Sequence, residues 1–265
     1  MKGRVLIIAG SDSGGGAGIQ ADIKTVTALG GYAATALTAL TAQNTVGVQG
    51  ILPVPTNFVR QQIDSILSDI GADAIKTGML LDHAVIEAMA DAIEAGAPDA
   101  PLVVDPVMVA TSGARLLDER AIGALGERLI ARAALVTPNA PEAEALTGMR
   151  VADLDGMRRA ADALLRLGAQ AAMVKGGHLD GDILRDLVVT RTGESFVLEA
   201  KRVDTRHTHG TGCTLASAIA VGLAQGMALK PAIERAHRFV QAAIRGAPGY
   251  GKGHGPLNHA VPFER

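Results

Sequence analysis

The stretch Arg4-Val5-Leu6-Ile7-Ile8-Ala9-Gly10-Ser11-Asp12-Ser13-Gly14-Gly15-Gly16-Ala17-Gly18 decides the fold. Its apolar part, residues 4–9, predicts a buried strand, and its glycine-rich part predicts a loop. The loop leads into a helical pattern over residues 18–29. A strand followed by a loop and a helix is the building unit of α/β proteins.

The same alternation continues along the chain. Short apolar runs predict further strands at residues 72–76, 102–104, 134–137 and 171–175. Longer periodic segments predict helices at residues 56–70, 82–95, 118–132, 153–167, 214–225 and 231–245. The predicted N-caps are Thr56, Asp82, Asp118 and Asp153, and the predicted C-terminal caps are Gly30, Gly71, Gly96 and Gly168. Repeated units of this kind predict a mostly parallel sheet with helices on both faces.

The last strand signals differ from the earlier ones. Residues 187–191 and 195–201 flank Thr192-Gly193-Glu194 and predict an antiparallel hairpin. The chain shows no linker, low-complexity segment or internal repeat. We therefore expect a single domain over residues 1–265.

Composition excludes several classes of function. The chain carries a net charge of −2 and has no Trp, two Tyr and four Phe, so we expect neither nucleic-acid nor anionic-membrane binding. Its single cysteine excludes an intramolecular disulfide and a Cys-rich zinc site. The first apolar run is too short for a signal peptide, and the apolar residues 213–229 include polar and glycine positions that favour a core helix. A cytoplasmic location is expected.

Polar or glycine-rich segments follow each predicted strand. They comprise residues 10–12, 77–79, 105–108, 138–139 and 176–178. In parallel sheets, ligands bind at the carboxyl ends of the strands. We therefore expect the chemistry of this protein at these segments.

The glycine-rich loop after the first strand favours contact with a substrate over a merely flexible turn, because glycines admit close approach of a ligand to the backbone. It lacks the Gly-Lys-[Ser/Thr] ending of a Walker A loop. Gly16-x-Gly18-x-x-Ala21 weakly matches a dinucleotide-binding motif, but no Asp or Glu lies between Asp22 and Asp64 to hold a ribose. The sequence thus argues against NAD.

A second glycine-rich turn, His209-Gly210-Thr211-Gly212-Cys213-Thr214, precedes an apolar helix. N–H groups at such a helix start suit a phosphate or a developing phosphoryl charge. Cys213 lies in the first helical turn, where the thiol pKa is expected to be lowered, so it is a candidate base or charge stabiliser. The alternative is a turn that caps a buried helix around a small packed cysteine.

Other side chains at these positions have both a chemical and a structural interpretation. Asp105 and Glu142 are candidate Mg²⁺ ligands, although a Pro-Glu pair also suits a helix start. Lys175 could neutralise a transferred phosphoryl group or simply extend to solvent. Gln43 ends a Thr-rich strand pattern and offers an amide to a heterocycle, whereas Asp22 could be an ordinary acid of a first helical turn.

The seven histidines do not form a metal motif. No pair shows the spacing of an HExxH or a Cys-His site. His207 and His209 are expected to shape their loop, so we expect no transition metal.

Eight motifs in order resemble the hydroxymethylpyrimidine/phosphomethylpyrimidine kinases of thiamine biosynthesis, which belong to the ribokinase-like superfamily. The motifs are Ala9-Gly10-Ser11-Asp12, residues 15–22, Thr41-Ala42-Gln43-Asn44-Thr45, Lys76-Thr77-Gly78-Met79-Leu80, Asp105-Pro106-Val107-Met108, Thr137-Pro138-Asn139-x-x-Glu142, Lys175-Gly176-Gly177-His178 and residues 208–214. The resemblance runs from about residue 4 to residue 259. It implies a three-layer ribokinase-like fold with a mostly parallel central sheet, helices on both faces and a small β-hairpin.

The resemblance also implies an activity and a set of roles. The activity is the ATP-dependent phosphorylation of 4-amino-5-hydroxymethyl-2-methylpyrimidine and then of its monophosphate, with Mg²⁺. The implied substrate-binding residues are Gly10, Asp22, Gln43, Met79 and Val107. Asn139, Lys175, Thr211 and Gly212 would bind ATP, and Asp105 and Glu142 would hold the metal. The implied catalytic residues are Cys213, Gly210, Thr211, Gly212 and Lys175.

Two positions depart from related sequences. Most ribokinase-like sugar kinases carry Asp at the position of Cys213, whereas Cys is typical of the pyrimidine kinases. Our hypothesis is that the second step has a phosphate as acceptor, which needs no strong base and would be repelled by a carboxylate. His207 stands where relatives often have Asn, and we expect it to alter loop packing alone.

Two other functions compete with this one. A pyridoxal or pyridoxine kinase is the nearest, because the superfamily shares one scaffold, but Met79, Gln43 and Cys213 together favour the pyrimidine. A non-catalytic ligand sensor would be expected to lose phosphate-handling residues, all of which are present. A homodimer is expected by analogy with the superfamily.

Overall fold

Alternation along β1 (Arg4–Asp12) divides the protein into two hydrophobic cores. Val5, Ile7 and Ala9 pack into one core, and Leu6 and Ile8 pack into the other. All five side chains are at most 1% exposed. Successive side chains of a strand point to opposite faces, so a strand that is apolar on both faces lies inside a sheet covered on both sides.

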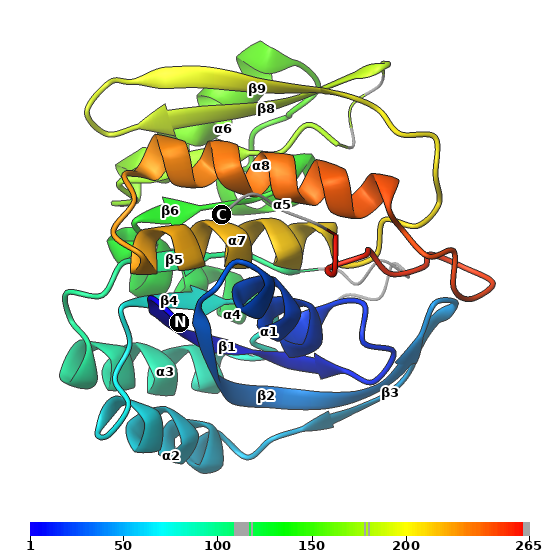
Figure 1. Cartoon of the computed structure of the whole chain (residues 1–265). Coiled ribbons are helices and arrows are strands. Elements are labelled where there is room, and N and C mark those ends of the chain that lie inside the picture. Colours follow the sequence, from blue (N-terminus) through cyan, green and yellow to red (C-terminus); the bar gives the residue numbers. More distant parts are fainter. Residues whose placement is uncertain (109–116, 118, 178, 180, 262–265) are drawn as a thin grey trace.

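The computed structural model describes residues 1–108, 117, 119–177, 179 and 181–261, and nine strands in this part of the chain form one twisted sheet (Figure 1). Their order is β3-β2-β1-β4-β5-β6-β7-β8-β9. The strands after β1 are β2 (Tyr32–Asn44), β3 (Gly47–Pro53), β4 (Ala74–Thr77), β5 (Leu102–Val104), β6 (Leu135–Val136), β7 (Ala171–Val174), β8 (Ile183–Thr190) and β9 (Ser195–Lys201). Strands β2, β1, β4, β5, β6 and β7 run parallel, and β3, β8 and β9 add antiparallel edges.

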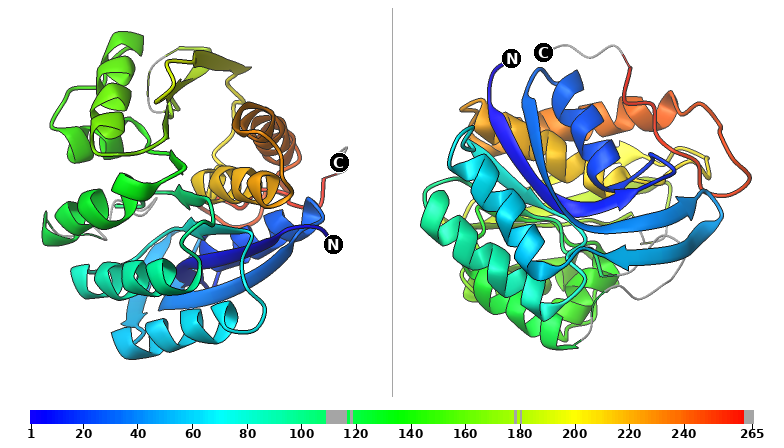
Figure 2. Two further views of the ribbon diagram at one scale, coloured as in Figure 1. Left: turned by 90° about the vertical axis from the view of Figure 1, so that its left-hand side faces the viewer. Right: turned by 90° about the horizontal axis from the view of Figure 1, so that it is seen from below.

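Helices cover both faces of the sheet (Figure 2). One layer contains α1 (Gly18–Ala28), α7 (Thr211–Ala224) and α8 (Leu229–Arg245). The other contains α2 (Thr56–Leu67), α3 (His83–Gly96), α4 (Glu119–Ala124), α5 (Ala140–Thr147) and α6 (Leu154–Arg166). Helix α7 is buried on almost all sides over residues 214–222 because it lies between the sheet and helices α1 and α8. Its first turn is therefore held rigidly at the strand ends.

The three-layer architecture predicted from sequence is confirmed, with differences in detail. The hairpin starts at Ile183, four residues earlier than expected, and its first strand pairs with β7, so it extends the main sheet. The helix expected over residues 118–132 is α-helical only in α4, and continues as a π-helical turn (Leu125–Leu129) and a 3₁₀ turn (Ile130–Arg132). Strand β3 and helix α5 were not predicted.

Helix caps follow the predicted chemistry at some positions only. Asp82 and Asp153 accept hydrogen bonds from the backbone of Val85 and Gly156, at 2.9 and 2.7 Å. The N-cap prediction for Thr56 is wrong, because Thr56 is the first helical residue of α2 and follows Pro55. Gly30 and Gly168 adopt positive φ angles two residues beyond their helices, and Gly71 does so four residues beyond α2. Gly96 is the last residue of α3. The predicted cap Asp118 lies outside the described residues.

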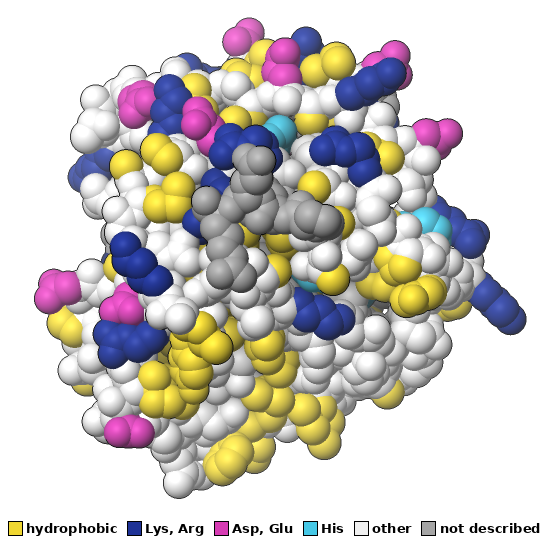
Figure 3. Space-filling view, in the orientation of Figure 1, with side chains coloured by type: hydrophobic (Ala, Val, Ile, Leu, Met, Phe, Trp, Pro, Cys, Tyr) yellow, Lys and Arg dark blue, Asp and Glu magenta, His cyan; other side chains and the backbone are white. Residues whose placement is uncertain are grey.

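The edge of the molecule formed by β2 and β3 is nearly free of charge. No Asp, Glu, Lys or Arg occurs from residue 25 to residue 59. Figure 3 accordingly shows few charged side chains in its lower part, where these strands lie, and more of them around β8, β9 and α8. Leu40, Ile51, Leu52 and Phe58 are each more than 40% exposed in this region. Among the described residues, no helix has the length and apolarity to cross a membrane.

Candidate active site

A cavity of about 1220 Å³ opens at the carboxyl ends of the parallel strands. Its walls come from the segments that follow these strands, from the start of α5 and α7, and from the connection between β9 and α7. The site residues expected from sequence that line it are Gly10, Gln43, Met79, Asp105, Val107, Asn139, Glu142, Lys175, Gly210, Thr211, Gly212 and Cys213. The structure thus brings together every expected site residue except Asp22.

The first turn of α7, residues 210–213, lines the cavity with features that suit an anion, and we call it the anion pocket. Gly210 adopts φ +85° at the N-cap, and a Cβ at this position would overlap the carbonyl oxygen of Gly16. The N–H groups of Gly212 and Cys213 precede the first i→i−4 bond of the helix and face its open end. A Cβ on Gly212 would lie 3.3 Å from the Lys175 ammonium. Glycine at position 210 therefore lets the two glycine-rich loops pack closely, and glycine at position 212 leaves space beside the Lys175 ammonium.

Lys175 places a positive charge beside this turn. Its Nζ lies 3.3 Å from Oδ1 of Asp105, which is 2% exposed and also approaches the Thr137 hydroxyl. Burial by itself would lower the pKa of Lys175, but the nearby carboxylates of Asp105 and Glu142 raise it overall. Lys175 is therefore a cation that can balance the charge of a bound phosphate.

Asn139 and Glu142 cap helix α5 and also face the cavity. The Asn139 side chain accepts from the Glu142 N–H at 2.9 Å, and the Asn139 N–H donates to the Glu142 carboxylate at 2.8 Å. This capping box is the structural role that the sequence left open, and both residues fulfil it while lining the cavity. Burial raises the pKa of Glu142 to about 7, with Asp105 adding to the effect and Lys175 opposing it.

The carboxylates of Asp105 and Glu142 are oxygen ligands of the kind that Mg²⁺ takes. The described part of the chain contains no group of three or more His, Cys, Asp and Glu side chains arranged to hold a metal. Magnesium commonly binds one or two carboxylates and takes its remaining ligands from phosphates and water. Two buried carboxylates beside an anion pocket fit this ion.

Cys213 does not have the lowered pKa that its position predicted. Burial raises the pKa of the thiol to about 12, and the carboxylates of Asp22 and Asp105 add to this effect. The charge of Lys76 and a hydrogen bond from the backbone of Gly18 oppose it but do not prevail. The thiol is neutral at physiological pH, because enclosure outweighs the helix dipole.

Asp22 lies beneath the cavity and not in its wall. Both carboxylate oxygens lie 2.9 Å from Nζ of Lys76, and the Ser217 hydroxyl donates to the carboxylate at 2.7 Å. Asp22 and Lys76 are both 0% exposed. Asp22 therefore lies below the cavity in this structure and does not line it. One feature of the sequence indicates this buried ion pair, because Lys76 is a lysine within an otherwise apolar strand.

Two tight turns shape one end of the cavity around Met79 and Val107. The Asp82 N–H bonds to the Leu80 carbonyl across Leu81, which has the positive φ of 70°. The Val107 N–H bonds to the Asp105 carbonyl at 2.9 Å. Gly10 completes this wall, because any Cβ there would overlap the Met79 side chain. The turn at residues 105–107 directly follows β5, the turn at residues 80–82 lies three residues after β4, and the apolar side chain of Met79 lines the cavity between them and Gly10.

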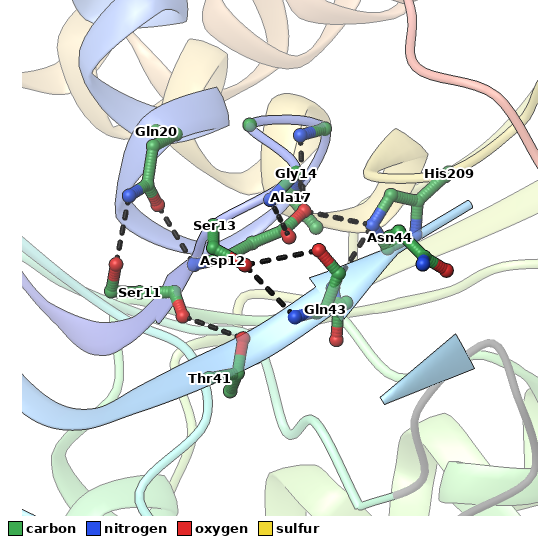
Figure 4. Close-up of polar contacts among 12 residues, drawn as sticks. Ser11, Asp12, Ser13, Gly14, Ala17, Gln20, Thr41, Gln43, Asn44 and His209 are labelled. Carbon is green, nitrogen blue, oxygen red and sulfur yellow. Dashed lines mark hydrogen bonds and ion pairs between the residues drawn. The ribbon is translucent and has the colours of Figure 1, made fainter. Parts of the chain in front are cut away.

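A polar network joins the first glycine-rich loop to the second (Figure 4). Asp12 accepts hydrogen bonds from the backbone of Gly14, Gly16 and Ala17, at 2.8, 3.0 and 2.8 Å. Nε2 of His209 lies 2.9 Å from the Asp12 carboxylate and 3.2 Å from the amide group of Gln43. Burial raises the pKa of Asp12, but its bond to His209 and the backbone N–H groups outweigh burial and lower it. Neither Asp12 nor His209 was predicted as a site residue, although both lie in the motifs.

The tail of the chain holds the second loop in place. The His209 N–H donates to the Gly255 carbonyl at 3.2 Å, and His254 N–H donates to the Thr45 carbonyl at 2.9 Å. His259 pairs with the hydroxyl of Thr214 in the first turn of α7, at 2.9 Å. Burial lowers the pKa of His259 to about 4, so this histidine is neutral.

The far end of the cavity carries residues that no motif pointed to. They are Asp182, Leu184, Arg202, Val203, Asp204, Thr205, Gln241 and Ile244. Arg202 donates to the carbonyls of Gly177, Leu179 and Gly181 and so organises the connection from β7 to β8. Lone polar residues on a hairpin and a helix give no recognisable spacing, and only the fold brings them together.

Comparison with known families agrees with this geometry. Residues 12–258 match the model of the phosphomethylpyrimidine kinase family. The chain belongs to this family. The match includes both glycine-rich loops, the cavity residues between them and the tail as far as Asn258.

Two relatives of this member of the phosphomethylpyrimidine kinase family each align with nearly the whole chain. It is 53% identical over 264 residues to the thiamine biosynthesis bifunctional protein ThiED of Geobacter sulfurreducens, covering 99% of the chain but 53% of that protein. It is 50% identical to a hydroxymethylpyrimidine/phosphomethylpyrimidine kinase of Streptomyces coelicolor, covering 96% of the chain and 93% of the relative. The chain thus spans about half of the Geobacter protein and almost all of the Streptomyces protein.

The fold has a close match among solved structures. The Bacillus subtilis pyridoxal kinase, solved as an ADP complex, superposes with a TM-score of 0.90 at 37% identity, covering 98% of each chain. The ribokinase-like architecture of this phosphomethylpyrimidine kinase family member is therefore shared with kinases named for another substrate.

Proposed function

We propose that the protein phosphorylates 4-amino-5-hydroxymethyl-2-methylpyrimidine and then its monophosphate, using ATP. The observation that carries this proposal is the set of groups that line one cavity. The anion pocket of residues 210–213, the Lys175 ammonium and the Gln43 amide all line it. A phosphate donor and a small heterocycle therefore have binding groups facing the same space.

The residues of the cavity divide between the two substrates. The N–H groups at the start of α7 and the Lys175 ammonium would hold the transferred phosphoryl group and balance its charge. Asp105 and Glu142 would hold Mg²⁺, which neutralises phosphate charge when bound. Gln43, Met79 and the segment at Val107 would surround the pyrimidine. We assign no ligand contact to Asp22.

The transfer places little demand on a base. The hydroxymethyl oxygen bonds to the γ-phosphorus as the bond to the β,γ-bridging oxygen breaks and ADP leaves, and the hydroxyl proton passes to an oxygen of the new phosphate. Phosphoryl transfer depends mainly on positioning and charge stabilisation. The neutral Cys213 thiol fits this requirement as a polar group against the acceptor. In the second step, the acceptor is a phosphate oxygen that carries no proton to remove.

Pyridoxal kinase is the second candidate, because the pyridoxal kinase of Bacillus subtilis has nearly the same fold. The higher identity to pyrimidine kinases favours the first candidate. The test is ADP release with ATP and Mg²⁺, measured in turn with the pyrimidine alcohol, its monophosphate and pyridoxal. Turnover of both pyrimidines supports the proposal. Turnover of pyridoxal without the pyrimidine monophosphate would overturn it.

Three expectations from the sequence stay predictions. They are a single domain over residues 1–265, a homodimer and a cytoplasmic location. Light scattering at several protein concentrations tests the dimer, and limited proteolysis tests whether the chain unfolds as one unit. Neither measurement bears on the catalytic proposal.

A further inference from the structure

The Asp12 carboxylate has a fixed charge and a fixed position. Three backbone N–H groups donate to it, from Gly14, Gly16 and Ala17, at 3.0 Å or less. The carboxylate is 3% exposed. An ionised carboxylate accepts hydrogen bonds and donates none. Whatever faces Asp12 from the other side must therefore bring a hydrogen.

His209 supplies that hydrogen from Nε2. This ring nitrogen lies 2.9 Å from Oδ2 of Asp12, within hydrogen-bond distance. A ring nitrogen that carries a proton has no lone pair left to accept a second bond. The contact with Asp12 thus fixes Nε2 of His209 as a donor toward every neighbour.

Gln43 is the second neighbour of the same nitrogen. The structure places Nε2 of its amide 3.2 Å from Nε2 of His209 (Figure 4). Because Nε2 of His209 carries a hydrogen, this placement makes the hydrogens of the NH₂ group and of the ring face each other. A half-turn of the amide about its last bond puts the oxygen there instead, where it shares the Nε2 hydrogen with Asp12.

We propose that Asp12 and His209 are positioning residues that fix the Gln43 amide with its oxygen toward His209 and its NH₂ group toward the cavity. The proposal rests on the proposed function, which places the heterocycle at Gln43. The cavity then offers a hydrogen-bond donor, and its complement is a ring nitrogen with a free lone pair. A half-turn of the amide would instead offer an acceptor and select an amino group.

The surroundings hold this arrangement rigidly. The Ser13 hydroxyl donates to the Gln43 carbonyl at 3.0 Å and accepts from the Gln43 N–H at 2.8 Å. The His209 backbone is bonded to Gly255 in the tail. Both partners of the amide contact are thus set before a ligand arrives, which is the condition for selective recognition.

Nitrogen NMR of the histidine rings tests the first half of the proposal without any substrate. Uniformly ¹⁵N-labelled protein is compared with His209→Phe, which identifies the signals of His209, and with His83→Phe, a surface control on α3. We expect the Nε2 of His209 to show the chemical shift of a protonated ring nitrogen near pH 8. An Nε2 with the shift of an unprotonated nitrogen would overturn the proposal.

Gln43→Glu tests the orientation directly. The glutamate keeps an oxygen toward His209 but replaces the NH₂ group in the cavity by a second oxygen. We expect KM for the pyrimidine to rise at least about tenfold while KM for ATP stays within about twofold. If the cavity-facing atom is already an oxygen, the variant will bind the pyrimidine about as well as the wild type, and the proposal fails.

Substrate analogues complete the test. In each of two analogues, one ring nitrogen of the pyrimidine is replaced by C–H. For the wild type, kcat/KM should be about tenfold or more lower with one of the analogues than with the parent pyrimidine. In His209→Phe, the ratio of these two kcat/KM values should move toward one. An unchanged ratio in His209→Phe would overturn the positioning role. Absence of any wild-type turnover of the parent pyrimidine would instead reject the proposed function, while the NMR result would still stand on its own.

Discussion

Lys76 and Asp22 form an ion pair that the protein encloses completely, with 2.9 Å from the ammonium to each carboxylate oxygen and 0% exposure of both side chains. It connects β4 to α1 and lies beneath the start of α7, where Ser217 also contacts Asp22. Burial alone would lower the pKa of Lys76, but the negative charges of the Asp22 and Asp105 carboxylates raise it. Lys76 is therefore charged, and its charge depends on a partner.

Asp22→Asn should destabilise the protein strongly. It leaves a buried ammonium without its counter-charge, which costs about 3–5 kcal/mol. Urea unfolding of the variant measures this loss. The matched control is Asp73→Asn, which removes a partly exposed pair with Arg4 and should cost below about 1 kcal/mol. Equal losses of unfolding free energy in the two variants would show that the buried ion pair contributes no more to stability than the exposed one.

The Cys213 thiol should react slowly with iodoacetamide. With a pKa of about 12, its thiolate fraction at pH 8 is about a thousandfold smaller than that of a free cysteine. The rate should still rise about tenfold per pH unit up to pH 10. Mass spectrometry follows the single cysteine without background, and Cys213→Ser shows the zero level. A rate at pH 8 within tenfold of that of free cysteine contradicts the raised pKa.

Cys213→Asp should slow the second phosphorylation more than the first. The new carboxylate would stand beside Asp105 and face an acceptor that is itself a phosphate, and like charges at this range repel. We expect the ratio of the two rates to shift by about tenfold or more. Cys213→Ser, which adds no charge, is the control. If Cys213→Asp leaves both steps equally fast, charge is not the reason for cysteine at this position.

Magnesium dependence should change around pH 7 because of Glu142. Its pKa of about 7 lies above its ordinary value, so the carboxylate loses its charge as the pH falls through 7. A metal ligand must be deprotonated, and the apparent affinity for Mg²⁺ should therefore weaken by up to about tenfold per unit below pH 7. Titration of activity with Mg²⁺ from pH 6 to 8 measures this slope. Glu142→Gln should bind Mg²⁺ more weakly and with a flatter dependence, and an unchanged slope would remove Glu142 from the site.

Gly210→Ala should impair catalysis as well as stability. The new Cβ would overlap the Gly16 carbonyl, which forces the first turn of α7 away from its position. Loss of donors to a transferred group costs about 10²–10³ in kcat. Gly226→Ala is the control, because Gly226 has φ +82° but no atom within 4 Å of its Cβ. The control should lose about 1 kcal/mol of stability and keep its kcat, so equal kcat values in the two variants would contradict the role of the turn.

Local pattern was sufficient to predict most of the architecture and to place the cavity at the carboxyl ends of the strands. Apolar strands such as Leu102–Val104 and capped helices such as α6 follow from period and cap chemistry, and the carboxyl ends of strands locate the ligand. Position along the chain also indicated which residues share the cavity, from Gly10 to Cys213. Each of these features is determined by residues that lie close together in the sequence.

What could not be predicted depends on enclosure and on distant partners. The pKa of Cys213 is set by burial and by Asp22, Lys76 and Asp105, none of which is near it in sequence. The buried position of Asp22 likewise depends on distant partners, because Lys76 and Ser217 hold the carboxylate below the cavity. The contact of Asp12 with His209 joins residues 197 positions apart and has no local signature.

The contact between His209 and the tail also has a consequence for how the enzyme comes into being. The first loop contributes Gly16, the second contributes Gly210, and Gly255 secures the second loop against the rest. During synthesis on the ribosome, these three parts leave the exit tunnel at widely separated times. The tail can therefore hold the second loop in its place only after residues near 255 have emerged from the ribosome.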